Sequence, residues 1–378
     1  MLPVLRLHGS PYEQGVQQGE AVGPQIARNW GQIRTLIESL IDGRDDWYRG
    51  LVGRNRGFIA QTDPDTIEEL TGIADGSGMP LDDVLAMNLP MYTSLRRARI
   101  IEECSVYGAS SSVTRDGRSY LLKTRDQPVD QFQFEHVVAY RAYRDGHRIV
   151  EVNAAGIITN PGSGINDAGL AVGTAGSWSK QHMDIHLADL GKAHAMPDMH
   201  YLLRHAENVT EAHEVLRETP RLAGMNIIVA DRDGAIGTVE VTHDDAILTL
   251  ADDGISAITN HYLHPGLQAL NDPAEKNPSS HMRYKTITGW LRKRRGDITA
   301  QDMLRLSMDH TNGPQNSVCR HAPDGTGSTT RYMSLMTVED FETWTFCDNP
   351  CRMALVVRAG EDDVAGETAG LAYEGAAQ

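Results

Sequence analysis

The sequence predicts an α+β fold with a helical segment at its N-terminal end. Helix signals dominate the first hundred residues. From residue 104 onwards, short runs of β-branched and apolar residues alternate with turn signals, which is typical of strands. The helices predicted after that point interrupt the strands only occasionally, and this favours antiparallel sheets over βαβ units.

Residues 1–100 are expected to be helical. Ser10 followed by Pro11 and Glu13 has the pattern of a helix start, with a cap, a proline in the first turn and an acid three residues after the cap. This helix is predicted to end near Ile41. Two further helices are predicted to begin near Pro64 and Leu81, separated by a Gly/Pro-containing break at 76–80.

The rest of the chain is predicted to mix strands with a few helices. Strands are expected at 106–113, 119–124, 136–143, 148–152, 170–173, 227–230, before Val241, and at 332–338, 344–346 and 353–357. Helices are expected at 198–206, 210–217, 283–293 and 300–308. The Gly/Ala/Glu-rich tail, 361–378, is expected to be disordered. The predicted organisation is a helical segment 1–103, an α+β domain 104–360 and this tail.

Composition and charge exclude several classes of function. The formal net charge of −16 argues against a nucleic-acid partner, because phosphate binding needs a basic face. We find neither a signal-peptide pattern nor an apolar run long enough for a membrane helix. Only four cysteines occur, which fits a reducing cytoplasm, and no CxxC or His/Cys spacing of a zinc site is present. We therefore expect a cytoplasmic protein with no metal ion, no cofactor and no membrane partner.

Cys104 is the candidate nucleophile. It lies in Glu102–Tyr107, where helical sequence gives way to strands. A lone free cysteine is more often a small buried core residue, and thiolate reactivity depends on the surrounding site. Position alone therefore leaves both interpretations open.

The segment that begins at Cys104 resembles the processing site of the acyl-coenzyme A:6-aminopenicillanic acid acyltransferase family. This is peptidase family C45, the isopenicillin N acyltransferase-like group of N-terminal-nucleophile hydrolases. In that family a Cys followed by Ser or Thr begins a strand–turn–strand whose second strand ends in Asp, as Cys104–Ser105 and Asp126 do here. Further similar motifs follow the family's order along the chain: Gly9–Gly15, Glu68–Gly78, Gly164–Leu170, Asn226–Asp231, Ile258–Leu263, Ser317–His321 and Ser328–Tyr332.

The resemblance implies a four-layer αββα sandwich and self-cleavage between Glu103 and Cys104. Residues 1–103 would then be a pro-segment or small subunit that stays associated with the catalytic domain, 104–360. The new α-amine of Cys104 would accept the thiol proton, as in other terminal-amine variants of nucleophile activation. Glu103 departs from the family pattern, in which Gly often precedes the Cys, and this puts efficient processing in question.

The resemblance also assigns roles to other side chains. Asn260 would stabilise the oxyanion. Asp126 would accept a hydrogen bond from the new amine or hold Arg331, which would steady the thiolate. Structural alternatives remain for these three: a turn cap for Asn260, a strand end for Asp126 and a surface ion pair for Arg331. The substrate-binding candidates are Ser105, Tyr107 and Asn166, although turn chemistry explains Asn166 equally well.

Three functions are weighed for this site. The preferred one is an amidohydrolase that acts on a small N-acyl amine through a thioester acyl-enzyme. The alternative is an acyltransferase that moves an acyl group from an acyl-CoA-type thioester to a small amine. A ligand-binding protein on the same fold is disfavoured because the set Cys104, Asp126, Asn260 and Arg331 is intact. A protease-like pairing of Cys104 with His261 or His321 is the rival to activation by the amine.

Overall fold

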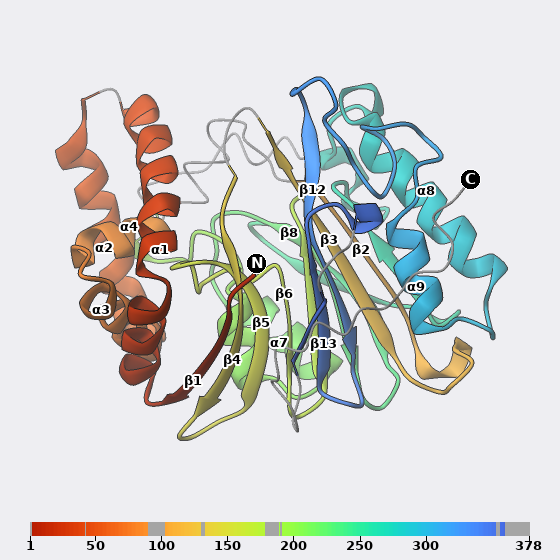
Figure 1. The fold of residues 1–378 in the computed structure, drawn as a ribbon, viewed down its shortest axis with the longest axis horizontal. Helices are drawn as coiled ribbons and strands as arrows, with labels where there is room; N and C mark the ends of the chain where they lie inside the picture. Colours follow the sequence, from red (N-terminus) through yellow and green to blue (C-terminus); the bar gives the residue numbers. More distant parts are fainter. Residues whose placement is uncertain are drawn as a thin grey trace.

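Two stacked β-sheets lie between layers of helices (Figure 1). The computed structural model describes residues 2–41, 43–89, 103–129, 133–177, 189, 191–352 and 356–359. Among them, no helix has the length and apolar character needed to cross a membrane. The layered arrangement confirms the predicted αββα sandwich.

Within the described ranges, the first sheet has eight strands and the second has six. In spatial order, the first contains β1 (Val4–Gly9), β4 (His136–Tyr143), β5 (Arg148–Ala154), β6 (Ser163–Asn166), β7 (Leu170–Ala175), β8 (Met225–Asp231), β9 (Ile236–Val241) and β10 (Ala246–Leu250). The second contains β11 (Ile255–Ile258), β2 (Glu103–Ala109), β3 (Tyr120–Pro128), β12 (Ser328–Thr337), β13 (Glu342–Cys347) and β14 (Val356–Ala359). All neighbouring strands are antiparallel except β1 and β4.

Helices cover the outer face of each sheet, so the layers enclose three apolar cores. The first sheet packs against α1 (Pro11–Ile41), α2 (Asp45–Thr62), α3 (Pro64–Ser77), α4 (Leu81–Asn88), α6 (Met199–His205) and α7 (Val209–Glu218). The second packs against α8 (Pro278–Lys293) and α9 (Ala300–Ser307). Between the sheets, Val106 and Leu121 of the second meet Val138 and Val150 of the first. Cys104 belongs to this middle core.

The capping signals correctly predicted where two of the front helices start. Ser10 Oγ accepts the backbone N–H of Glu13 at 3.2 Å, and the Glu13 carboxylate accepts the N–H of Ser10 at 2.7 Å. Asp63 caps α3. The N-terminal ends of α1 and α3 are therefore satisfied in the way the sequence pattern indicates.

Small residues in the two front motifs allow α1 and α3 to touch backbone to backbone. A Cβ added at Gly15 would lie 2.1 Å from the carbonyl oxygen of Glu69, and one at Gly72 would lie 2.1 Å from that of Tyr12. No side chain fits at such distances. The Gly9–Gly15 and Glu68–Gly78 motifs are thus two halves of one helix contact.

A fully buried ion cluster joins these helices to the first sheet. Arg141 of β4 pairs with Glu69 of α3 and Glu151 of β5, and His200 of α6 contacts Glu151 at 3.0 Å. Burial alone would raise the pKa of Glu69, but the charge of Arg141 together with His200 and Arg204 outweighs burial and lowers this pKa to about 2. Burial alone would lower the pKa of His200, but the carboxylates of Glu151 and Glu69 together raise it to about 9. The cluster is therefore ionised at neutral pH.

The front segment is less purely helical than predicted. Strand β1 was missed, and it places residues 4–9 in the first sheet, parallel to β4. Helix α2 lies within the segment expected to be helical, although no separate helix was named there, and the short strands β6, β10 and β11 were missed. The tail 361–378, predicted to be disordered, lies outside the described residues.

Candidate active site

Cys104 is the second residue of β2, a strand held between β3 and β11. Its side chain is 4% exposed and faces the first sheet from within the middle core. The buried ammonium group of Lys123, on β3, donates to Cys104 Sγ at 3.2 Å and also to the carbonyl oxygen of Thr174 on β7. A positive charge thus lies directly beside the thiol, where it would stabilise a thiolate.

Tight packing holds Lys123 in this position. A Cβ at Gly162 would lie 2.8 Å from Lys123 Cε and 2.0 Å from the hydroxyl oxygen of Tyr332. Lys123 was not among the predicted site residues. The available signal was a lysine next to two leucines in the strand predicted at 119–124, since a lysine that such a strand buries needs a partner.

Asn260 lies beside the backbone of Cys104. Its Oδ1 accepts the Cys104 N–H at 3.2 Å, and its Nδ2 donates to the carbonyl oxygen of Gly176 at 2.8 Å. The backbone N–H of Asn260 donates to Ser280 Oγ at 2.8 Å, which fixes the residue. An amide NH2 has two hydrogens, and the bond to Gly176 uses one of them.

Arg283 of α8 is a second residue that the sequence analysis missed. Its guanidinium is fully buried and donates to the Cys104 carbonyl oxygen at 2.5 Å, to Ser105 Oγ at 2.9 Å and to Asn260 Oδ1 at 2.8 Å. Burial lowers its pKa. The available sequence signal was its i, i+4, i+8 spacing with Ile287 and Leu291. Residues at this spacing share one face of a helix, and here that face of α8 is buried.

The residue before Cys104 is also anchored. Glu103 forms an ion pair with Arg320, and both side chains are largely buried. In the strand register Glu103 lies opposite Asp126, whose carboxylate is 3.9 Å from Arg320 and accepts the Thr330 hydroxyl at 2.7 Å. Burial raises the pKa of Asp126 to about 6, although Arg283 and Thr330 partly oppose this.

Arg331 lies at an irregularity in the pairing of β12 with β3 and lines a cavity of about 670 Å³. Its Nε is buried and has no hydrogen-bond partner among the described residues. Val129, His310, His321, Asn349 and Arg352 also line this cavity. It lies beyond the end of β3, at the end of the sheet where β2 begins. Among the described residues, none of the contacts of Cys104 or Asp126 is made by Arg331.

The predicted substrate-binding residues have local partners. Tyr107 donates to the Met303 carbonyl oxygen at 3.0 Å in the core under α9. Ser105 Oγ bonds Arg283, as described above. Asn166 donates to the carbonyl oxygens of Leu203 and Ala206 and accepts the N–H of Leu170 at 2.9 Å. These contacts give all three a structural role, and substrate binding by them stays a prediction.

The histidines of the rival mechanism are engaged elsewhere. His261 Nδ1 lies 2.7 Å from Ser280 Oγ, and its ring stacks on His281 with centroids 3.9 Å apart. Burial, together with His281 and Arg283, lowers the pKa of His261 to about 3. His321 contacts Cys319 and Cys351 rather than Cys104. The geometry therefore favours the lysine and not an imidazole as the partner of the Cys104 thiol.

Comparison with known proteins identifies relatives of the chain. The family model described as acyl-coenzyme A:6-aminopenicillanic acid acyl-transferase matches residues 113–351. This match begins nine residues after Cys104. An uncharacterised protein of Archaeoglobus fulgidus is 24% identical over 390 residues, covering 90% of this chain and 63% of that protein. Protein dcd1A of Dictyostelium discoideum is 26% identical over 144 residues, covering 33% and 31%. The chain thus spans less than two thirds of the length of either relative.

Solved structures with a similar arrangement include two hydrolases. A mutant of the conjugated bile acid hydrolase from Clostridium perfringens is 13% identical, with 68% of this chain and 94% of that chain covered and a TM-score of 0.41. Penicillin V acylase from Agrobacterium tumefaciens is also 13% identical, with 69% and 78% covered and a TM-score of 0.36.

Proposed function

Because the chain belongs to the acyl-coenzyme A:6-aminopenicillanic acid acyl-transferase family, we propose that it is a self-processed cysteine amidohydrolase that acts on small N-acyl amines. The observation that carries the proposal is the environment of Cys104. Its sulfur contacts Lys123, its nitrogen contacts Asn260, and its carbonyl oxygen contacts Arg283. Three atoms of one residue are thus each held by a different segment: strand β3, the loop after β11 and helix α8.

The proposed first reaction cuts the chain. Cys104 Sγ attacks the carbonyl carbon of Glu103, and the C–N bond between the two residues breaks as the nitrogen takes a proton. Water then hydrolyses the thioester, which frees the thiol and leaves Glu103 with a new carboxylate. The Lys123 ammonium favours this attack because it stabilises negative charge on the sulfur.

The proposed second reaction uses the new chain end. An α-amine has a reference pKa near ~8, so a fraction of it is neutral at pH 7 and can accept the thiol proton. Asn260 Oδ1 already accepts a hydrogen bond from this nitrogen in the uncut chain. The second hydrogen on Asn260 Nδ2 would donate to the oxyanion, and losing such a donor typically costs ~10²–10³-fold in rate. Arg331, whose Nε is unpaired among the described residues and which lines the cavity, would contact the substrate or the thiolate.

Glu103 differs from the Gly that often precedes the nucleophile in this family, and Arg320 offers a reason for tolerating it. The buried carboxylate of Glu103 is paired, so its burial does not leave an isolated charge. We propose that this ion pair fixes the scissile peptide in place of a conformationally permissive glycine. Residues 1–103 and 104–378 would remain associated after cleavage, because β1 and the helices α1–α4 pack on the first sheet.

Intact-mass measurement tests the processing step. We expect two fragments that meet between Glu103 and Cys104, a single unbroken chain for Cys104→Ala, and normal processing for Cys347→Ser as a matched cysteine control. An unbroken chain with full activity would contradict activation by the amine. An active Cys104→Ala variant would end the proposal for the nucleophile.

The family description favours acyl transfer as a second candidate function. Both functions share the acyl-enzyme and differ in whether water or an amine resolves it. A panel of N-acyl amines, including N-acyl derivatives of 6-aminopenicillanic acid, assayed with and without acyl-CoA separates them. Free acid supports the hydrolase, and new amide formed only with a thioester donor supports the transferase. A cytoplasmic location and the absence of nucleic-acid partners stay predictions.

A further inference from the structure

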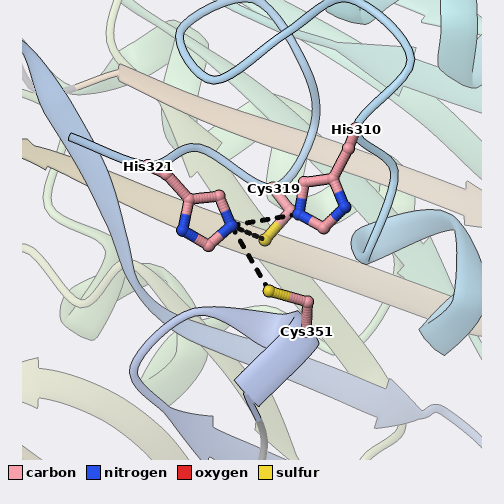
Figure 2. Close-up of side chains that lie close together, drawn as sticks. All are labelled: His310, Cys319, His321 and Cys351. Atoms are coloured by element: carbon pink, nitrogen blue, oxygen red, sulfur yellow. Dashed lines mark hydrogen bonds between the residues drawn. The ribbon is translucent and has the colours of Figure 1, made fainter. Parts of the chain in front are cut away.

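Four metal-ligating side chains converge beside the cavity, outside the site of Cys104. His310, Cys319, His321 and Cys351 each offer one ligand atom, and these four atoms all lie within 4.8 Å of one another. Figure 2 shows the four side chains pointing toward a common centre. Cys319 is fully buried, and the others are partly or well exposed. All four cysteines of the chain are free.

The distances around His321 fit a metal site better than hydrogen bonding. Its Nε2 lies 3.0 Å from His310 Nε2, 3.4 Å from Cys319 Sγ and 3.3 Å from Cys351 Sγ. An imidazole nitrogen has either one hydrogen or one lone pair, so it can satisfy only one of these three neighbours. Ligands around a tetrahedral zinc ion are separated by about 3.3 Å for two nitrogens and about 3.6 Å for nitrogen and sulfur, given the usual Zn–N and Zn–S bonds.

We propose that His310, Cys319, His321 and Cys351 bind one Zn²⁺ ion. Two thiolates and two neutral imidazoles form a Cys2His2 set, which is the ligand type of structural zinc sites. Two thiolates balance the charge of the ion, and binding releases the two thiol protons. Four protein ligands leave no open position, so the ion has a structural role rather than a catalytic one.

The ion would tie two separate segments together. Three ligands lie in the loop between α9 and β12, and Cys351 lies in the short helical turn η6 (Pro350–Arg352) that follows β13. Arg320 lies between two of the ligands and pairs with Glu103. Holding the loop against η6 would therefore also hold Arg320 against the residue before Cys104. This goes against the sequence-based expectation of no metal ion, which rested on the absence of a familiar spacing.

Metal content of the purified full-length protein tests the proposal independently of any enzymatic activity. We expect about one zinc per chain by plasma mass spectrometry after purification without chelators. Cys351→Ser and His310→Ala alter exposed ligands, so these variants should fold, and each should lower the zinc content at least fivefold. Matched controls at residues outside the cluster, Cys347→Ser and His243→Ala, should keep the full content.

Cobalt provides a second readout. Replacement of zinc by Co²⁺ should give the intense visible absorption of a tetrahedral thiolate site in the wild type and in both controls. Loss of this absorption in Cys351→Ser supports the assignment. The proposal is overturned if the wild type takes up neither metal, if the variants bind as much metal as the controls, or if peptide mapping without reductant finds a Cys319–Cys351 disulfide.

Discussion

Replacing Lys123 by methionine tests how the Cys104 thiol is activated. Methionine keeps most of the apolar stem of the side chain, is one heavy atom shorter, and removes the charge together with its hydrogen-bond donors. The ammonium nitrogen lies 3.2 Å from Cys104 Sγ, and at an effective dielectric constant of about 20 two unit charges at this separation interact by about 5 kcal/mol. Removing the ammonium also removes the cost of burying it, which offsets part of the loss. We therefore expect the thiolate reaction to slow by ~10²–10³-fold, since each 1.4 kcal/mol is about a factor of ten.

Alkylation by iodoacetamide at fixed pH measures this reactivity without requiring a substrate. Peptide mass spectrometry follows Cys104, while Cys347 in the same sample reports any general change in reagent access. Lys285→Met, which removes an exposed lysine of α8, is the matched control and should react like the wild type. If Lys123→Met keeps the wild-type rate at Cys104 while its circular dichroism is unchanged, the ammonium does not activate the thiol and the reasoning is refuted.

Three more perturbations have clear expected results. Gly162→Ala should slow alkylation at Cys104 by no more than the ~10²–10³-fold expected for Lys123→Met, with little change in helix content, because its Cβ would lie 2.8 Å from Lys123 Cε; an unaffected rate would contradict this packing. Arg141→Met should lower the free energy of unfolding by about 3–5 kcal/mol in urea titrations, since it leaves the two buried carboxylates of Glu69 and Glu151 with only the charge of His200 between them, and a loss under ~1 kcal/mol would refute this. The pKa of His200 is raised to about 9, so its contribution is complete below its unfolded pKa of ~6.5 and disappears as the pH rises through 9. Stability should therefore fall by about 3 kcal/mol between pH ~6.5 and ~9.5, and His200→Gln should lack this slope.

Local chemistry explains which parts of the fold were predictable. The starts of α1 and α3 followed from Ser10 and Asp63, because a cap is a property of a few adjacent residues. Helix α2 contains Gly50, Gly53 and Gly57, which weaken helix propensity. It forms because its apolar face packs into the core that the helices α1–α4 share with the first sheet. This segment was expected to be helical, but the bounds of α2 depend on that packing and were not predicted from local patterns.

Strand β1 was missed for a different reason. Its burial alternates along Val4–Gly9, as expected for an edge strand, but its partner β4 lies more than 120 residues later. The parallel pairing closes only after the chain has passed through α1–α4 and then through β2 and β3 of the second sheet. A run of six residues next to a strong helix signal gives no hint of such a distant partner.

The candidate site was predictable where motifs carried it. The strand–turn–strand after Cys104 places Glu103 opposite Asp126, and Asn260 contacts the Cys104 nitrogen. Lys123 and Arg283 were missed because their importance depends on burial beside Cys104, which strand pairing and the docking of α8 create. The Cys/His cluster was missed likewise, since its ligands at 310, 319, 321 and 351 meet only once η6 packs against the preceding loop.

Burial of the Cys104 sulfur in the middle core is compatible with a nucleophile because a buried ammonium group lies beside the sulfur. A cysteine that only fills a core has apolar neighbours, whereas this sulfur accepts a hydrogen bond from a buried ammonium group. Burying that ammonium is costly unless it has partners, and one of the two partners described is the sulfur itself. If Cys104 only filled the core, an apolar side chain at position 123 would avoid the free-energy cost of burying an ammonium group. The charge beside Cys104 is therefore the strongest structural argument that this residue carries chemistry.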